Sequence, residues 1–150
     1  MGRASGVLMA VSSLPNSYGI GTFGKEAYDF IDFLVRTKQR YWQVLPLTTT
    51  SYGDSPYQSF SAAAGSPYYI DLKDLEKLGY LKSDDFEDIS FGTSNTCVDY
   101  GALFVNHRRL LNRAFDRFMQ DVPADFEKFC HDHAEWLDPY AEFMSLKEEF

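Results

Sequence analysis

The sequence lacks several features that would place it in a common class of protein. No run of residues approaches the roughly 18 apolar residues of a membrane-spanning helix. The first residues, Met1 to Gly6, lack the basic region and apolar stretch of a secretory signal. Basic residues are few, because 14 Lys and Arg stand against 22 Asp and Glu and give a net charge of −8. Nucleic acid is therefore not expected as a partner, since no basic stripe is available to neutralise phosphates.

Cysteine is also scarce, with only Cys97 and Cys130 in 150 residues. Without a signal or a membrane span we expect a cytoplasmic protein, in which free thiols are more common than disulfides. Neither cysteine has a C-x-x-C partner, and no P-loop or G-x-S-x-G string occurs. His131 and His133 would point about 200° apart on a helix, so they cannot share a metal ion. The sequence therefore predicts no metal site.

Two apolar runs flank a helical pattern in the first third of the chain. Residues Gly6–Ser12 and Tyr41–Leu47 are almost continuously apolar, which is typical of buried parallel strands. Between them a helix is expected from Gly24 to about Lys38, with Thr22 as its cap. The stripe that should face the sheet consists of Ala27, Phe30, Ile31 and Leu34. This order predicts a βαβ unit.

A dinucleotide site is an alternative interpretation of the same region. Gly19, Gly21 and Gly24 form a G-x-G-x-x-G string between the first strand and the helix. Such a site needs an acidic residue at the end of the second strand, where this chain has Leu47-Thr48-Thr49. The turn Ser12–Ser17 is also longer than a tight phosphate-binding loop. We therefore reject dinucleotide binding.

The second half of the chain is predicted to be mainly helical. Asp71 is placed to cap a short helix that Gly79 ends. A longer helix is expected from Asp99 to about Gln120, another over Ala124–Leu137, and a third that starts at Pro139 and runs through Phe150. The residues expected to face inward are Leu72, Leu75, Leu78, Leu103, His107, Leu110, Leu111, Ala114, Phe115, Phe118, Phe126, Phe129, Cys130, His133 and Leu137. Two strands followed by helices indicate part of a larger architecture.

A long polar loop follows the second apolar run and carries the candidate site. It combines many hydroxyl groups and an amide with the rings of Tyr52, Tyr57, Tyr68 and Tyr69. Such groups bind sugars, because sugar hydroxyls need donors and acceptors and the C–H faces of sugar rings pack on aromatic faces. An ordinary surface loop is equally rich in Ser, Thr, Gly and Pro. Composition alone leaves both interpretations open.

The order of residues in this loop is more specific than its composition. The string Tyr52-Gly53-Asp54-Ser55-Pro56-Tyr57-Gln58-Ser59, preceded by Gln43-Val44-Leu45-Pro46-Leu47, resembles the amylomaltases, the 4-α-glucanotransferases of glycoside hydrolase family 77. The same resemblance extends to Ser5-Gly6-Val7-Leu8, Ser12-Ser13-Leu14-Pro15, Tyr18-Gly19-Ile20-Gly21 and Ala27-Tyr28-Asp29-Phe30. The chain departs from the family at Ala63, where Phe is frequent, and at Ser66, where Asn is usual.

The resemblance implies an α/β fold. Residues 1–70 would form the first two parallel strands and crossover helix of a (β/α)8 barrel, with the site loop at 48–70. Residues 71–150 would form a mainly helical insertion subdomain, cut off at its C-terminus. A complete barrel takes about 250 residues, so this chain cannot close one. The family's catalytic Asp, Glu and Asp map onto no position here and are expected downstream of Phe150, and no metal or organic cofactor is implied.

The family's substrate contacts do map onto this chain. Tyr57, with Ser55 and Asp54 beside it, would correspond to the tyrosine that packs against sugar near the cleaved bond. Tyr52 and Tyr100 resemble an aromatic pair that holds a remote part of the glucan, although Tyr100 could equally pack at the start of a helix. A retaining mechanism needs two carboxylates, and the loop offers only Asp54. We therefore expect this chain to bind glucan without cleaving it.

The implied reaction is the transfer of α-1,4-glucan segments to the 4-hydroxyl of a glucan or of glucose, with retention of configuration. Maltooligosaccharides would be the donors, and neither nucleic acid nor a membrane is expected as a partner. Two alternatives stay open at this point: a non-catalytic α-glucan-binding module, and a hydrolase of the α-amylase type.

Overall fold

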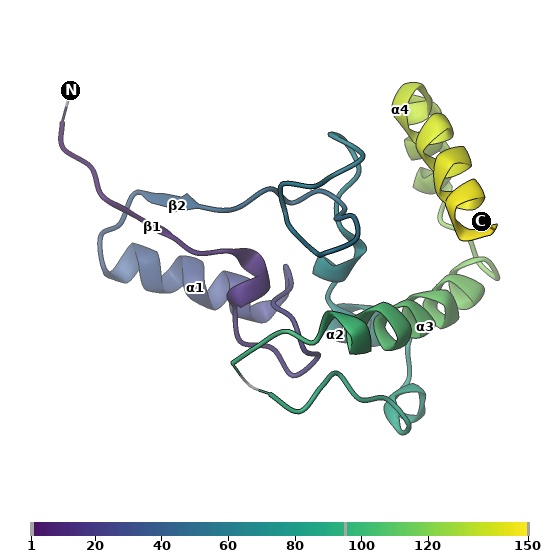
Figure 1. Ribbon diagram of the computed structural model, residues 1–150, viewed down its shortest axis with the longest axis horizontal. Helices are drawn as coiled ribbons and strands as arrows, with labels where there is room; N and C mark the ends of the chain where they lie inside the picture. The colour runs from purple at the N-terminus through teal and green to yellow at the C-terminus, as the bar shows by residue number, and fades with distance from the viewer. Residues whose placement is uncertain (1, 95, 150) are drawn as a thin grey trace.

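A computed structural model describes residues 2–94 and 96–149 of the chain. Two short strands and four α-helices follow one another as β1 (Gly6–Leu8), α1 (Lys25–Arg36), β2 (Tyr41–Gln43), α2 (Leu72–Lys77), α3 (Tyr100–Phe118) and α4 (Ala124–Glu149). Three short 3-10 turns lie between them, η1 (Val11–Ser13), η2 (Pro67–Tyr69) and η3 (Ser83–Phe86). The strands and α1 lie at one end of the molecule, α2 and α3 lie in the middle, and α4 stands at the other end (Figure 1).

The two strands pair in parallel, with Gly6 opposite Tyr41 and Leu8 opposite Gln43. Because α1 connects them, the predicted strand–helix–strand unit is confirmed. Gly6 is required at this pairing, since a Cβ there would lie 2.5 Å from the carbonyl oxygen of Tyr41. The amide of Met9 donates to the carbonyl of Gln43 at 3.0 Å, which extends the contact by one residue.

The strands are shorter and more exposed than predicted, so the expectation of two fully buried strands over Gly6–Ser12 and Tyr41–Leu47 is wrong. Leu8 is 59% exposed and Tyr41 is 65% exposed. Within the described residues each strand has a partner on one side only. The pairing of the two strands ends where the chain leaves β1 and enters the 3-10 turn η1.

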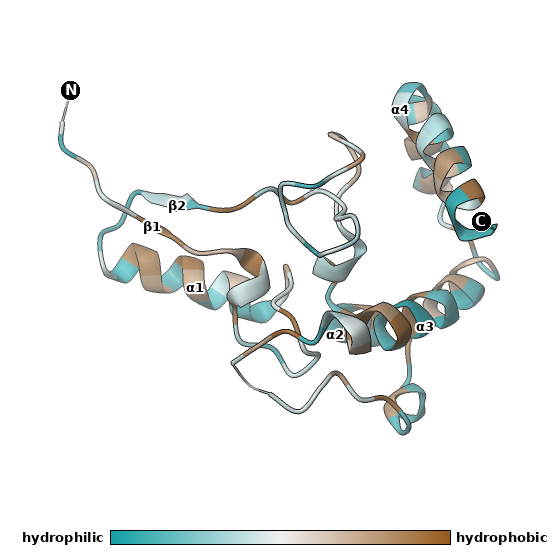
Figure 2. Ribbon diagram, in the orientation of Figure 1, coloured by the Kyte–Doolittle hydropathy of each residue, from teal (hydrophilic) through white to brown (hydrophobic). Residues whose placement is uncertain are grey.

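A small core forms between the strands and α1. Its buried members are Val11, Leu14 and Ala27. Trp42 closes it, because its indole N–H donates to the carbonyl of Met9 at 2.8 Å and its ring meets Phe30 edge-on at 5.0 Å. Figure 2 shows the corresponding hydrophobic bands on α1.

The start of α1 differs from the prediction. Gly24, not Thr22, is the N-cap, and no side chain caps the helix. The buried hydroxyl of Thr22 instead donates to Oδ2 of Asp71 at 2.5 Å. Gly24 packs directly against that carboxylate, since a Cβ on Gly24 would lie 1.9 Å from Oδ2. Of the predicted stripe, Leu34 is buried with Ala27, but Ile31 is 44% exposed.

Asp71 also performs its predicted role as the N-cap of α2. Its Oδ1 accepts from the amide of Asp74 at 3.0 Å. Gly79 follows α2 with φ of +83°, the left-handed conformation expected of a glycine that ends a helix. Leu78 was expected to face inward, but it is the C-cap residue that follows α2 and is 68% exposed.

The second core lies between α2 and α3 and is sealed more completely than the first. Leu72, Leu81, Leu110 and Ala114 are its buried members. The predicted extent of α3 is confirmed, and Leu103 and His107 lie on the same buried face. Phe115 was also expected there but is 55% exposed, because it lies beside the stripe and not on it.

An ion pair fastens the segment before α3 onto that helix. Both terminal guanidinium nitrogens of Arg117 donate to Asp85, at 2.5 and 2.9 Å, and Nη1 also donates to the carbonyl of Tyr80 at 2.8 Å. The Arg117 hydrogen bonds lower the pKa of Asp85 to about 2. The carboxylate of Asp85 is therefore charged at physiological pH.

Helix α4 is a single helix, so the prediction of two helices divided at Asp138-Pro139 is wrong. Pro139 lies inside it. A proline removes one helical hydrogen bond, and on an exposed helix the freed carbonyl can bond to water. No described residue of α4 is buried, and Phe126 and Phe129, which were expected inward, are 38% and 46% exposed. Phe150, part of the predicted third helix, lies outside the described residues.

Other sequence features occupy simple surroundings. Cys97 and Cys130 are free thiols. His131 is exposed, whereas His133 packs against Phe129 with ring centroids 4.5 Å apart. In the ranges that the structure describes, no helix has the length and apolar character needed to cross a bilayer.

Candidate functional site

The polar loop leaves the end of β2 and returns to η2, and hydrogen bonds close it at its base. The backbone pairs Thr48 with Gly65 in an antiparallel bridge. The amide of Thr49 donates to the carbonyl of Ala64 at 3.2 Å, and the amide of Ser66 donates to Leu47 at 2.9 Å. These bonds pair the two ends of the loop with each other.

The tip of this loop, residues 51–58, is built from two consecutive turns. The amide of Asp54 donates to Ser51 at 3.1 Å and that of Gln58 donates to Ser55 at 3.0 Å. A third bond, from the amide of Ser51 to Gln58 at 2.9 Å, closes the tip. Gly53 takes φ of +98° and Asp54 takes φ of +57°, so the first turn depends on a left-handed backbone.

The two tyrosines of the tip lie on its surface. Tyr52 is fully exposed and Tyr57 is 73% exposed. Tyr57 lines an open hollow together with Phe60, Thr48 and hydroxyl-bearing Ser59 and Ser61. An exposed ring with hydroxyl groups beside it can pack against one face of a sugar and hydrogen-bond its edge.

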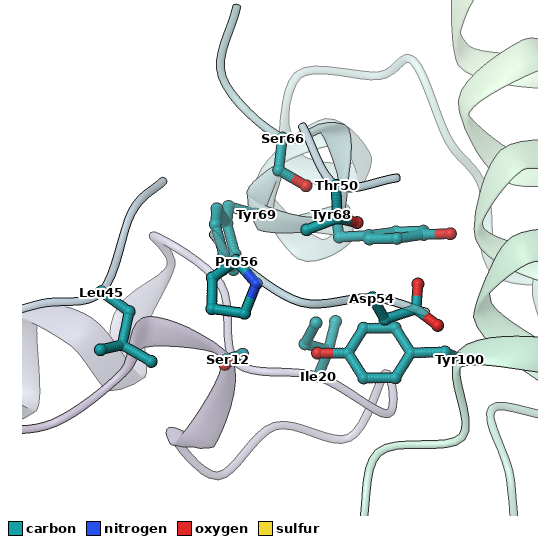
Figure 3. Close-up of a pocket in the computed structure, with 10 residues that line it drawn as sticks. All are labelled: Ser12, Ile20, Leu45, Thr50, Asp54, Pro56, Ser66, Tyr68, Tyr69 and Tyr100. Atoms are coloured by element: carbon teal, nitrogen blue, oxygen red, sulfur yellow. The ribbon is translucent and has the colours of Figure 1, made fainter. Parts of the chain in front are cut away.

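A second, more enclosed cavity lies on the other side of the tip. Its lining comes from η1 and the segment before α1, from the end of the second apolar run, from the polar loop and η2, and from the start of α3. The lining residues are Ser12, Ile20, Leu45, Thr50, Asp54, Pro56, Ser66, Tyr68, Tyr69 and Tyr100 (Figure 3). The rings of Tyr68 and Tyr100 are 6.2 Å apart. The carboxylate of Asp54 lies beside both rings in Figure 3.

Burial shifts the titration of all three groups in the same direction. It raises the pKa of Asp54 above that of an ordinary Asp. It also raises the pKa values of Tyr68 and Tyr100, and the neighbouring charge of Asp54 adds to both shifts. Both phenols therefore stay protonated and can act as hydrogen-bond donors and acceptors.

His107 packs behind the ring of Tyr68, which lines the enclosed cavity. It is fully buried on α3, and its ring meets Tyr68 edge-on with centroids 5.7 Å apart. Neither ring nitrogen has a hydrogen-bond partner among the residues described. Burial lowers the pKa of His107 to about 4 and outweighs the nearby Ile70 backbone, which acts in the opposite direction. The imidazole is therefore neutral at physiological pH and packs as a flat ring.

Three of the five predicted contact residues line these surfaces. Asp54 and Tyr100 line the enclosed cavity, and Tyr57 lines the open hollow. Ser55 lines neither; its Oγ accepts from the amide of Tyr57 at 3.4 Å. Tyr52 lines neither as well and projects into solvent.

Tyr68 and Tyr69 belong to the predicted polar loop but were not among the five predicted contact residues. The sequence feature that could have indicated them is Pro67, which occupies the first position of η2 and is followed by the two tyrosines. What the sequence did not contain was the contact between η2 and α3, which brings Tyr68 to Tyr100. Among the residues that the structure describes, Asp54 is the only carboxylate that lines either surface.

The chain is similar to known proteins over almost its whole length. The model of the family described as 4-alpha-glucanotransferase matches residues 9–150. The chain belongs to this family. It is 57% identical over 150 residues to the 4-alpha-glucanotransferase of Streptococcus pneumoniae serotype 4, and 47% identical over 149 residues to that of Thermus thermophilus. These matches cover 99% and 97% of this chain and 30% and 29% of the two relatives.

A solved structure extends the likeness to three dimensions. Amylomaltase from Streptococcus agalactiae in complex with acarbose superposes with a TM-score of 0.93 at 50% identity. The superposition covers 99% of this chain and 30% of the amylomaltase. The chain thus spans about a third of the length of the relatives it matches.

Proposed function

We propose that this chain is the N-terminal part of a 4-α-glucanotransferase and supplies substrate contacts to it. The whole protein would cleave an α-1,4-glucan with retention and transfer the segment to the 4-hydroxyl of another glucan or of glucose. The observation that carries this proposal is the closed tip 51–58, which exposes Tyr57 beside a hollow, in a chain 57% identical to a 4-alpha-glucanotransferase.

Each contact has a proposed role that follows from its surroundings. Tyr57 is exposed, so its ring can pack against a sugar face, with Ser55 holding the backbone of the same turn. Tyr100 and Asp54 line a cavity of mixed polar and apolar lining, and their hydroxyl and carboxylate would hydrogen-bond sugar hydroxyls. Tyr52 stands clear of both surfaces and would meet only a glucan long enough to extend beyond the tip.

The chain contributes binding and orientation, not bond cleavage. Retaining glycosyl transfer uses a carboxylate nucleophile and a separate acid/base group about 5–5.5 Å apart. Asp54 alone cannot fill both roles, so the catalytic carboxylates would come from another part of the protein. A glucan held on aromatic rings favours transfer over hydrolysis, because the acceptor sugar occupies the place that water would take.

The division of the chain is proposed on the same basis. Residues 1–70 would begin a (β/α)8 barrel, as the parallel pair β1 and β2 with α1 between them supports. Residues 71–150 would form a helical subdomain inserted into that barrel. A relative solved in complex with acarbose supports an α-glucan-type oligosaccharide as the ligand. A cytoplasmic location and the lack of a cofactor stay predictions from the sequence.

Incubation of the whole protein with maltotriose tests the reaction. Transfer produces glucose together with maltodextrins longer than maltotriose, whereas a hydrolase produces glucose and maltose alone. The 150-residue chain by itself should bind maltoheptaose and leave it unchanged. If the whole protein binds maltotriose but does not convert it, the protein is a non-catalytic glucan-binding module and the proposed reaction is overturned.

A further inference from the structure

Phe60 connects the site loop to a distant helix. It lies just beyond the tip 51–58, and its ring stacks on Tyr140 of α4 at 6.5 Å with an interplanar angle of 16°. The ring of Phe143 lies 5.4 Å away on the same helix. Nζ of Lys147 sits 4.5 Å from the Phe60 centroid. Phe60 is thus held by three side chains that share one face of α4.

This contact is one of few that hold α4 in place. The helix has no buried residue within the described part of the chain. Its first turn meets α3 through Phe126, whose ring lies 5.2 Å from that of Phe118. Its last turn carries Glu148, which forms an ion pair with Arg108 of α3. The cluster at Phe60 is the contact that ties α4 to the site loop.

The same ring also forms part of the candidate site. Phe60 lines the open hollow with Tyr57, three residues earlier in the loop. The hydrogen bonds that order the following residues stay within the loop, from Ser59 to the carbonyl of Ser61 at 2.7 Å and from the amide of Ala64 to Ser61 at 3.0 Å. The shape of the hollow therefore depends on where α4 holds Phe60.

We propose that Tyr140 and Phe143 are positioning residues, which fix Phe60 and thereby hold Tyr57 and its hollow in the glucan-binding arrangement. This inference rests on the proposed function, because it assumes that Tyr57 contacts glucan. It adds that the helical half of the chain, far from the tip in sequence, determines affinity at the loop. Tyr140 and Phe143 contact Phe60 and do not themselves line the hollow.

The test compares two phenylalanines of α4 that are equally accessible. Phe143 and Phe129 are each 46% exposed, but only Phe143 contacts Phe60. Phe143→Leu and Phe129→Leu are each compared with the unaltered protein by hydrogen exchange of the loop amides and by maltoheptaose titration. Tyr140→Leu removes the stacked ring, and Tyr140→Phe restores it without the hydroxyl.

We expect Phe143→Leu and Tyr140→Leu to speed exchange of the loop amides and to weaken maltoheptaose binding, each by about two- to tenfold, the factor that corresponds to one aromatic pair. Phe129→Leu and Tyr140→Phe should match the unaltered protein in both measurements. Unchanged loop exchange in Phe143→Leu and Tyr140→Leu would overturn the positioning role, whether or not the sugar binds. Failure of the unaltered protein to bind maltoheptaose would instead overturn the proposed function.

Discussion

The two sides of the candidate site owe their order to different causes. The inner wall consists of Tyr68, which packs on His107 of α3, and Tyr100, the first residue of α3. The buried face of this helix includes His107 and Leu110, both 0% exposed. The outer tip, residues 51–58, is held by three backbone hydrogen bonds within itself. A wall backed by a core is as stable as the fold, whereas a tip held by its own turns can change shape while the protein stays folded.

This difference separates two kinds of mutation. A change behind the wall should lower the free energy of unfolding and affect ligand binding only through it. A change in the tip should affect ligand binding and leave the free energy of unfolding almost intact. Each of the following measurements can therefore confirm or contradict this division between effects on stability and effects on binding.

The largest effect on stability is expected from Leu110→Ala. Leu110 is fully buried in the α2–α3 core, so its truncation should cost about 2–5 kcal/mol through lost burial and the cavity left behind. Urea unfolding measures this cost. The control is Leu78→Ala, because Leu78 is 68% exposed and its truncation should cost less than about 0.5 kcal/mol. Equal losses in the two variants would show that α3 does not support the wall in this way.

His107 should make the stability of the wall depend on pH. Its pKa of about 4 in the folded protein lies below the unfolded value of 6.5. Between these two pH values the unfolded chain binds a proton on His107 and the folded protein does not. The contribution is fully present above pH 6.5 and is lost as the pH falls to about 4, by about 3 kcal/mol.

Urea unfolding between pH 7 and pH 4 checks this prediction. His107→Leu should remove most of the loss over that interval, whereas His131→Leu, at an exposed position, should keep it. A pH profile that His107→Leu leaves unchanged would mean that the imidazole accepts a proton in the folded state.

A smaller effect is expected in the tip from Gly53→Ala. Gly53 has φ of +98°, a conformation that costs an L-residue about 1–2 kcal/mol. Maltoheptaose binding should weaken by at least about fivefold, because the first turn must rearrange. Gly65→Ala is the control in the same loop, since no atom lies within 4 Å of a Cβ there. Equal binding by both variants would show that the tip's backbone does not determine affinity.

The sequence predicted the local features of the fold well. Apolar runs separated by a helical stripe led to the parallel pair of β1 and β2, and Asp71 and Gly79 marked the ends of α2. These features depend on the hydrophobic period and on backbone conformation, both of which are local properties. The long polar loop after the second apolar run was likewise predicted.

The errors came from partners distant in the sequence. Thr22 was assigned to the nearest helix, but its hydroxyl bonds to Asp71, 49 residues later. The strands were expected to be buried because their residues are apolar, but burial depends on neighbours that lie outside a local pattern. The inner wall was missed for the same reason, because Tyr68 meets Tyr100 only through the docking of η2 on α3.

One titration tests the central claim most directly, that the exposed ring of Tyr57 binds glucan. Tyr57→Ala is compared with Tyr28→Ala, because both tyrosines are exposed, by 73% and 67%, and Tyr28 lies on α1 away from the loop. The account predicts that maltoheptaose binding weakens at least about tenfold in Tyr57→Ala, a loss of about 1.4 kcal/mol, with unfolding free energy unchanged. It predicts unaltered binding in Tyr28→Ala. Equal affinity of the two variants for maltoheptaose would contradict it.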